Sequence, residues 1–273
     1  MKTHSVTGGG GLRLHVQETG NPQGKPILFI RGFSQCRLAW NKQLHSDLAN
    51  DFRLVAMDIR GHGLSDKRRD VYGDSKLWAD DLQAVITTLG SAKPVLVGWS
   101  YGGIIMSDYV AAYGEDRVAG TCWVGAMSRL GEPLVQGGFI GADFLALVPG
   151  FFSENVSESV PALEQFARLC LYDEPAPEDL YLFLGCCAIV PPSVRQGLLA
   201  RNLNNDPVIE RMRKPMLLIY GQRDMIALPT MCTHLAGLAK HSKVSSYPIV
   251  GHAPFWEAPE RFNRELGEFR ESV

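Results

Sequence analysis

The stretch from Pro94 to Gly103 constrains the fold more than any other part of the chain. It begins with a short apolar run, Val95 to Val97, which is typical of a buried parallel strand. A helical pattern follows from Ile104 to Tyr113. Between the two lies a Gly-x-Ser-x-Gly motif with Ser100 at its centre, so the chain must reverse from strand to helix within a few residues.

Such a reversal forces the central residue into a strained backbone conformation and requires small neighbours. A side chain at Gly98 or Gly102 would collide with the adjoining strand or helix. The turn would push the Ser100 hydroxyl out above the sheet, and it would point the N–H at the helix start toward whatever that hydroxyl attacks. A plain connecting turn has the same residues, so the interpretation depends on whether the chain also supplies a base, an acid and an oxyanion hole.

Strands and helices alternate at both ends of the chain, which predicts a mostly parallel sheet flanked by helices. The expected strands are 12–18, 26–30, 52–57, 95–97, 118–124, 215–220 and 243–248. The expected helices are 37–50, 77–89, 104–113, 229–238 and 259–269. This order of elements predicts the α/β fold class.

The alternation stops near residue 128. Residues 129 to 208 lack any convincing strand and are rich in Phe, Leu, Pro and Gly. Helical patterns lie near 160–171, 177–187 and 192–202. We therefore expect a core domain of residues 1–128 and 209–273, with a helical cap of residues 129–208 inserted between its two parts.

Composition excludes several classes of partner. The chain has 273 residues, which is enough for one α/β domain with a modest insertion. A net charge of −2 gives no electrostatic footprint for nucleic acid or for an anionic membrane. No segment reaches the roughly 18 consecutive apolar residues that a membrane helix requires. We expect a small-molecule partner, no nucleic acid and no membrane span.

The N-terminus and the cysteines predict a cytoplasmic protein. The first residues have no apolar region of the kind found in a signal peptide. The six cysteines lack C-x-x-C spacing, which favours reduced buried thiols over a disulfide framework. We expect no metal site, because His62 has no His, Cys or carboxylate at ligand spacing on a common face.

Each strand that follows residue 208 ends in a residue that a serine nucleophile needs. Strand 215–220 is followed by Asp224, and strand 243–248 is followed by His252. Residues just beyond the carboxyl ends of strands converge on one crevice in open α/β sheets, so we expect Ser100, Asp224 and His252 to meet. An imidazole would take the hydroxyl proton, and a carboxylate would fix the tautomer of the imidazole and stabilise its cation.

Other interpretations of these residues are open from the sequence. Asp224 also fits a turn residue or an N-cap before the helix that begins at Pro229. His252 also fits a loop histidine. His62, in the glycine-rich loop that follows strand 52–57, is the main rival of His252 as the base.

An oxyanion would need two backbone N–H donors. We expect one from Tyr101, directly after the nucleophile, and the other from Phe33, in the loop after strand 26–30. Gly32 fits this loop because a substrate carbonyl must approach the backbone closely.

Together these motifs resemble the α/β-hydrolase fold superfamily, in its capped, cofactor-free branch of carboxylesterases, lactonases and non-haem haloperoxidase-like esterases. The resemblance covers about residues 10–128 and 209–270. It rests on Arg31-Gly32-Phe33, Asp58-x-Arg60-Gly61-His62-Gly63-x-Ser65, Gly98-Trp99-Ser100-Tyr101-Gly102-Gly103, Gly221-x-x-Asp224 and Gly251-His252. It implies an eight-stranded-type sheet, the chain order Ser, Asp, His and a largely structural role for residues 58–65, which weakens His62 as a base.

Arg31 departs from the family pattern, which usually has His-Gly before the oxyanion residue. Arg31 could do the same structural work by hydrogen-bonding the loop, or its guanidinium could bind a substrate carboxylate or carbonyl; we favour the first account. Trp99 resembles the Gly-Trp-Ser turn of some methyl-ester esterases. Arg31, Gly32 and Trp99 are therefore the candidate substrate-binding residues.

The serine nucleophile and the resemblance predict a hydrolase that cleaves carboxylic esters of small-to-medium apolar substrates through an acyl-serine intermediate. Serine at this turn argues against haloalkane dehalogenation and epoxide hydrolysis, for which the fold employs aspartate. The expected cap contains six phenylalanines that favour an apolar pocket, namely Phe139, Phe144, Phe151, Phe152, Phe166 and Phe183. The alternatives are a lactonase, a haloperoxidase-like perhydrolase and, outside enzymes, a ligand-binding receptor on the same fold.

Overall fold

A computed structural model describes residues 1–90 and 92–273, and it confirms the α/β class with a mostly parallel eight-stranded sheet. The strands are β1 (Lys2–Thr7), β2 (Arg13–Gly20), β3 (Pro26–Ile30), β4 (Arg53–Asp58), β5 (Val95–Trp99), β6 (Gly120–Val124), β9 (Met216–Gly221) and β10 (Lys243–Tyr247). Their order across the sheet is β1-β2-β4-β3-β5-β6-β9-β10. β2 pairs antiparallel with β1 and β4, and all the other pairings are parallel.

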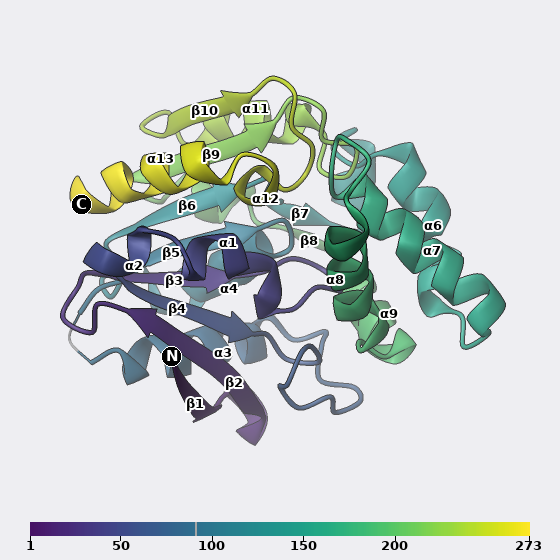
Figure 1. Cartoon of the computed structure of the whole chain (residues 1–273), viewed down its shortest axis with the longest axis horizontal. Coiled ribbons are helices and arrows are strands. Elements are labelled where there is room, and N and C mark those ends of the chain that lie inside the picture. The colour runs from purple at the N-terminus through teal and green to yellow at the C-terminus, as the bar shows by residue number, and fades with distance from the viewer. Residues whose placement is uncertain (91) are drawn as a thin grey trace.

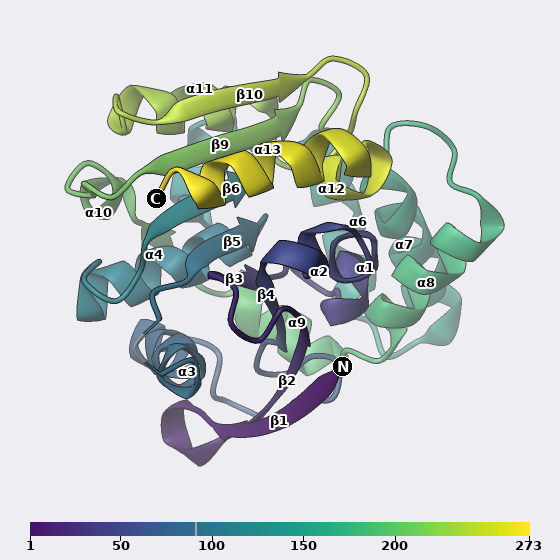
Figure 2. The same ribbon diagram turned by 60° about the vertical axis from the view of Figure 1, so that its left-hand side comes forward.

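Helices cover both faces of this sheet (Figure 1, Figure 2). α1, α2 and α13 lie on one face, and α3 and α4 lie on the other. Their bounds are α1 (Asn41–Leu44), α2 (Leu48–Asp51), α3 (Ser75–Thr88), α4 (Gly102–Tyr113) and α13 (Pro259–Glu271). Because both faces are covered, every residue of β3, β5 and β6 is buried, as their continuous apolar runs predict.

The chain between β6 and β9 carries a separate group of helices. They are α5 (Glu132–Gln136), α6 (Ala142–Phe152), α7 (Val156–Leu169), α8 (Pro177–Ala188), α9 (Pro192–Leu199) and α10 (Asp206–Ile209). In Figure 1, α6 to α9 stand together beyond the arrowheads of the central strands. The carboxyl ends of these strands therefore face the α6–α9 group.

Two expectations about local structure are wrong. Residues 129 to 208 do contain strands, because β7 (Arg129–Leu130) pairs with β8 (Leu203–Asn204), and two residues are too few to show a period. The helix expected over 37–50 is broken into a 3₁₀ turn and the short helices α1 and α2. Ser46 Oγ donates to the Gln43 carbonyl and accepts from the Leu48 N–H, so local side-chain bonds replace the helical ones.

The two remaining helices flank the ends of the last two strands. α11 (Pro229–Leu238) follows β9 and matches the predicted bounds. α12 (Pro254–Glu257) is a single turn after β10 that we did not predict. Within the described residues no single helix is long and apolar enough to span a membrane; α8 and α9 meet that test only as a pair bent by 83°.

A buried ion pair joins the glycine-rich loop after β4 to helix α3. Arg60 donates from Nε to Asp81 Oδ2 at 2.7 Å and from Nη2 to Asp81 Oδ1 at 2.8 Å. Further N–H groups of Arg60 donate to the carbonyls of Val71 and Leu77. Both charged side chains are almost fully buried, so removing either one would leave the other as an uncompensated buried charge.

We expect Asp81→Asn to lower the free energy of unfolding by about 3 to 5 kcal/mol, because it leaves the Arg60 guanidinium buried without its counter-charge. Urea denaturation followed by circular dichroism measures the loss. Asp80→Asn is the matched control, since the neighbouring Asp80 pairs with Lys76 at the surface, where a pair contributes at most about 1 kcal/mol. Equal losses in the two variants would contradict this account.

Candidate active site

The turn between β5 and α4 has the strained geometry that the Gly-x-Ser-x-Gly motif predicts. Ser100 has a φ of +54°, in the left-handed region that side chains other than glycine rarely adopt. Its N–H donates to the Val124 carbonyl at 3.0 Å, and its own carbonyl accepts from the N–H groups of Gly103 and Met127. The conformation of Ser100 is therefore fixed by β6 and the chain after it as well as by α4.

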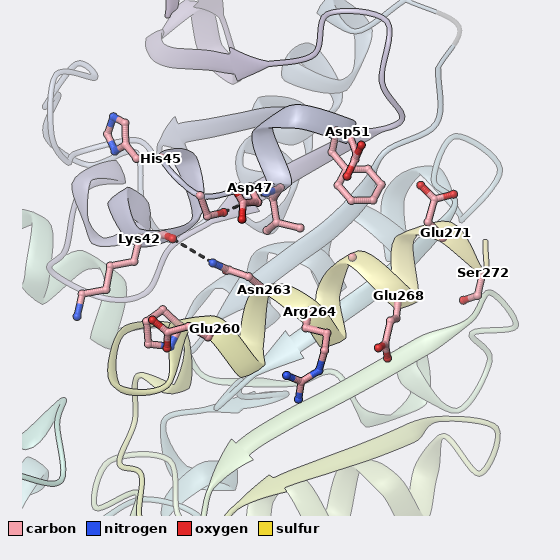
Figure 3. A pocket seen from close by; sticks show the side chains of 15 residues that line it. Lys42, His45, Asp47, Asp51, Glu260, Asn263, Arg264, Glu268, Glu271 and Ser272 are labelled. Carbon is pink, nitrogen blue, oxygen red and sulfur yellow. Dashed lines mark hydrogen bonds between the residues drawn. The ribbon is translucent and has the colours of Figure 1, made fainter.

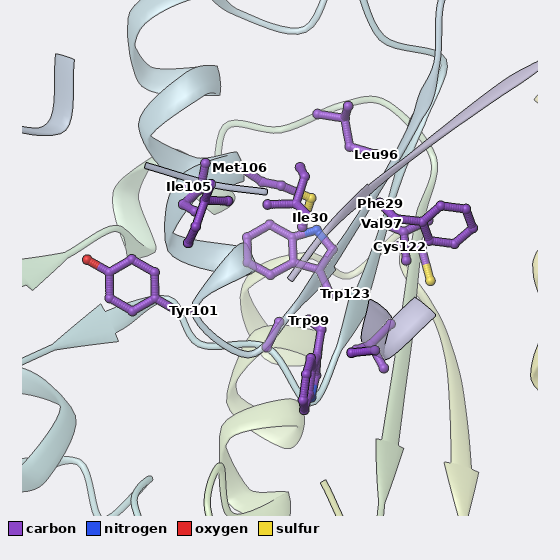
Figure 4. Packing of buried hydrophobic residues seen from close by; sticks show 14 of the residues in the cluster. Phe29, Ile30, Leu96, Val97, Trp99, Tyr101, Ile105, Met106, Cys122 and Trp123 are labelled. Atoms are coloured by element: carbon purple, nitrogen blue, oxygen red, sulfur yellow. The ribbon is translucent and has the colours of Figure 1, made fainter. Parts of the chain in front are cut away.

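The space around this turn requires glycine at two positions. A Cβ at Gly98 would lie 2.4 Å from Met106 Cε, and a Cβ at Gly102 would lie 2.6 Å from the carbonyl oxygen of Ile30. Figure 4 shows Ile30, Ile105 and Met106 packed around the turn. Both contacts are the collisions with strand and helix that the motif implies.

His252 and Asp224 meet beside this turn. Nδ1 of His252 lies 2.7 Å from Asp224 Oδ2, and both side chains are almost fully buried. The other oxygen of Asp224 accepts the Ile226 N–H at 2.8 Å. The Trp99 indole N–H donates to the His252 carbonyl at 2.8 Å, which holds His252 against the residue before Ser100. No hydrogen bond among the described residues joins Ser100 to His252, and such contacts often tighten only when substrate binds.

The loop after β3 brings Gly32 directly against Ser100. A Cβ at Gly32 would lie 2.9 Å from Ser100 Cβ and 3.5 Å from its Oγ. In the part of the chain that the structure describes, neither the Phe33 N–H nor the Tyr101 N–H donates to another protein group. Two backbone donors next to Ser100 are thus available to a bound oxygen, as an oxyanion hole requires.

Arg31 and His62 form hydrogen bonds to the backbone of this loop. Arg31 is fully buried; its Nη1 donates to the Gly32 carbonyl at 2.8 Å, and its Nε lies 4.0 Å from Asp58 Oδ1. Burial lowers the pKa of Arg31 to about 10, although Asp58 opposes the shift. His62 Nε2 is 3.3 Å from the Ser34 N–H, and burial lowers the pKa of His62 well below its ordinary value, so the ring is a neutral acceptor. These contacts favour the structural account of Arg31.

A largely enclosed apolar cavity of about 30 Å³ lies over Ser100. Its walls come from the loop after β3, the turn at Ser100, the chain after β6, helices α5, α6, α7 and α9, and the loop after Asp224. The lining residues besides Ser100 are Phe33, Tyr101, Met127, Leu130, Leu134, Ile140, Phe144, Phe166, Leu199 and Ile226. Neither Arg31 nor Trp99 lines the cavity, and no charged side chain of the described residues does.

Aromatic packing joins the loop after β3 to α6 and α7. The ring centroid of Phe33 lies 6.1 Å from that of Phe144, 5.5 Å from that of Phe151 and 5.8 Å from that of Phe166. Phe144 and Phe166 are thus the two predicted phenylalanines that reach the cavity. The sequence does not reveal the aliphatic lining, because those residues are spread over several loops and helices.

The other predicted phenylalanines lie away from the cavity. Phe151 packs behind Phe144 and Phe166, and Phe183 packs against Trp99, while Phe139 and Phe152 do not line the cavity. Trp99 is 1% exposed and positions His252 through its indole N–H.

Arg201, which follows α9, is a buried contact to the site that the sequence analysis missed. Its Nη1 donates to Tyr101 Oη at 3.0 Å, and its Nη2 donates to Asp108 Oδ2 at 2.7 Å and to Ser75 Oγ at 2.8 Å. The end of α9 is thereby fixed to the residue after Ser100. No local pattern marks Arg201, because all these partners lie far away in the chain.

A much larger concavity, about 1190 Å³, lies elsewhere, between α1, α2 and helix α13 (Figure 3). Charged side chains surround it, including Lys42, Asp47, Glu260 and Arg264. It contains none of Ser100, Asp224 and His252. Size alone therefore does not identify the site, and the chemistry at the strand ends does.

We expect Gly102→Ala to lower the free energy of unfolding by about 1 to 3 kcal/mol, because the added methyl group meets the Ile30 carbonyl in a packed core. Gly185→Ala is the matched control. Gly185 is an exposed helical glycine in α8 with open space around its Cβ position, so alanine there should stabilise by roughly 0.5 to 1 kcal/mol. Chemical denaturation of both variants measures the effects. A change in the free energy of unfolding with the same sign in both variants would contradict the packing argument.

The chain is similar to known proteins over nearly its whole length. Residues 27–265 match the family described as "Alpha/beta hydrolase family". An esterase from Rhodococcus sp. ECU1013 superposes with a TM-score of 0.95 and is 33% identical, with 100% of both chains covered. A bifunctional esterase/perhydrolase of Acinetobacter calcoaceticus is 28% identical, covering 97% of this chain and 98% of its own. A pimeloyl acyl-carrier-protein methyl ester esterase of Vibrio cholerae is 24% identical, covering 94% and 98% respectively.

Proposed function

The chain belongs to the alpha/beta hydrolase family and is an esterase-type member of it, and from that premise we propose that it cleaves small, uncharged carboxylic esters through an acyl-serine intermediate. The single observation that carries the proposal is the buried His252–Asp224 pair beside the strained turn at Ser100. The relatives that share the whole length of the chain and are named as esterases support the reaction class.

In this proposal His252 removes the proton of the Ser100 hydroxyl while Oγ attacks the ester carbonyl carbon. Asp224, at 2.7 Å from Nδ1, keeps the imidazole in the correct tautomer and stabilises the imidazolium that forms. His252 then returns the proton to the leaving alcohol. The alcohol departs, and the acyl group remains bonded to Ser100 Oγ. Water attacks the acyl carbon in the second half-reaction, with His252 again as the base, and Ser100 is regenerated.

The negative charge on the carbonyl oxygen would be stabilised by the N–H groups of Phe33 and Tyr101. Gly32 lets the substrate approach, since its missing Cβ leaves room beside Ser100 Oγ. Arg31 holds the Gly32 carbonyl, and Gly103 and Met127 hold the Ser100 carbonyl. These carbonyls share their peptide groups with the two donors, so both donors are oriented before substrate binds. Preorganised donors need no rearrangement as the charge develops, which is the main source of their effect on rate.

The cavity over Ser100 supports a short apolar acyl group. Since about 10 to 15 Å³ of such space holds one water molecule, 30 Å³ leaves room for only a few atoms. Its lining carries no charge, so a carboxylate or an ammonium group on the acyl chain would lose its solvation without gaining a partner. In this proposal residues 129–208 act as the cap that closes the pocket, through the walls given by α5, α6, α7 and α9.

A lactone is an alternative substrate, because a ring-closed ester reacts at the same groups. Perhydrolysis is the second candidate activity, since the Acinetobacter calcoaceticus relative is named for both reactions. In that reaction hydrogen peroxide replaces water as the acceptor of the acyl group. No other residue is required for either alternative.

We expect Ser100→Ala to reduce kcat on p-nitrophenyl acetate by about 10⁴ to 10⁶, because the acyl-enzyme cannot form. Asp224→Asn should cost about 10⁴ through the wrong tautomer of His252. The release of p-nitrophenol measures both, and the formation of peracetic acid after hydrogen peroxide is added tests perhydrolysis. Cys232→Ala, a buried change at a residue that does not line the cavity over Ser100, is the control. Equal turnover by wild type and Ser100→Ala would refute the mechanism.

We expect Phe144→Ala to shift the preference from acetyl toward hexanoyl esters by roughly 10- to 200-fold in relative kcat/KM, since a ring that closes the cavity is removed. Rates on p-nitrophenyl esters of increasing chain length measure the shift. Leu145→Ala is the matched control, because Leu145 is the next residue of α6 and is 39% exposed. An unchanged profile in Phe144→Ala would show that the cavity does not hold the acyl chain.

A further inference from the structure

The carboxylate of Glu257 joins two segments that are far apart in the chain. Its Oε1 accepts the Gly251 N–H at 2.8 Å, and its Oε2 accepts the Tyr172 N–H at 2.7 Å. Gly251 directly precedes His252, and Tyr172 lies in the turn between α7 and α8. One oxygen is thus bonded to the α6–α9 group, at Tyr172, and the other to the loop after β10, at Gly251. Glu257 therefore lies at the boundary between this group of helices and the sheet with its flanking helices.

The turn and the loop are also in direct contact. A Cβ at Gly251 would lie 2.8 Å from the backbone nitrogen of Tyr172 and 2.9 Å from the carbonyl carbon of Leu171. On the other side of the loop, the Trp99 indole holds the carbonyl of His252. The backbone on both sides of the imidazole is therefore fixed, at Gly251 through Glu257 and at His252 through Trp99.

We propose that Glu257 is a positioning residue that fastens the turn between α7 and α8 to the loop carrying His252, and that its ionisation makes turnover depend on pH. The inference rests on the proposed function, because it concerns how the base His252 is held. Glu257 itself does not line the cavity over Ser100. Its effect on turnover is transmitted through Gly251.

The surroundings of Glu257 make this carboxylate sensitive to protons. Burial raises the pKa of Glu257 to about 7; the two N–H donors oppose the rise, and the charges of Asp173 and Asp224 add to it. No cation among the described residues lies within ion-pair distance of the carboxylate. The titratable and charged groups around it and its two partners are Cys170, Asp173, Arg223, Asp224, His252 and, against the neighbouring Trp256, Lys42.

The sign of the effect follows from the hydrogen bonds. An ionised carboxylate accepts at both oxygens, whereas the protonated acid carries a hydrogen on one of them and loses much of its capacity to accept there. As pH falls through about 7, one of the two backbone bonds of Glu257 weakens and the His252 loop loosens. His252 must also be neutral to act as a base, so the acid side of the pH–rate profile contains two protonation steps.

The test compares kcat/KM for p-nitrophenyl acetate between about pH 5 and pH 9 in three forms of the full chain. We expect Glu257→Gln to lower kcat/KM by roughly 10- to 100-fold at high pH, because the amide cannot accept from both N–H groups. We also expect its acid limb to contain one protonation step instead of two. Glu260→Gln, an exposed change three residues away, should leave the rate and both steps unchanged.

A Glu257→Gln enzyme that keeps both protonation steps overturns the inference, whatever its rate, because a purely structural role would lower the rate equally at every pH. The amide proton shifts of Tyr172 and Gly251 in the wild type give a second test that needs neither a variant nor turnover. We expect both shifts to titrate with a midpoint near 7, and flat shifts overturn the inference. A wild type without ester turnover would refute the proposed function alone, and the amide shifts would still decide the role of Glu257.

Discussion

The rest of the site depends on the strained backbone of Ser100. A residue with φ of +54° is unfavourable by about 1 to 3 kcal/mol, so the surrounding structure must enforce it. The enforcement comes from three hydrogen bonds: Val124 accepts the Ser100 N–H, and the N–H groups of Gly103 and Met127 donate to its carbonyl. The same contacts fix the position of the hydroxyl, so the backbone strain of Ser100 and the placement of its hydroxyl have one cause.

The buried polar side chains around Ser100 mostly bind backbone rather than one another. Arg31 donates to the Gly32 carbonyl, Trp99 donates to the His252 carbonyl, and Glu257 accepts from Gly251. Each of these contacts fixes a loop at the carboxyl end of a strand, where no ladder of strand hydrogen bonds continues. A loop that holds a reacting group must be as rigid as the sheet, and such bonds supply that rigidity.

The parts of the fold that the sequence predicts are those with local signals. The apolar runs of the central strands and the position of Asp224 and His252 just after strands are visible in the sequence, and these two side chains lie 2.7 Å apart. The direction of the Arg31 guanidinium is not predictable, because it depends on Asp58 at the end of another strand, β4. The role of Glu257 is hidden for the same reason, since one of its partners lies 85 residues away.

Contacts across the boundary also determine how the largely enclosed cavity widens to admit a substrate. Lifting the α6–α9 group as a body would break the bonds from Gly141 to Ile226 and from Leu228 to Phe139, and also those made by Arg201 and Glu257. Rotation of an apolar wall such as the Phe144 ring breaks no hydrogen bond, and an off-rotamer side chain costs only about 0.5 to 1.5 kcal/mol. Opening by side-chain rotation is therefore favoured over movement of the whole α6–α9 group, because the apolar walls can move without leaving buried polar groups unpaired.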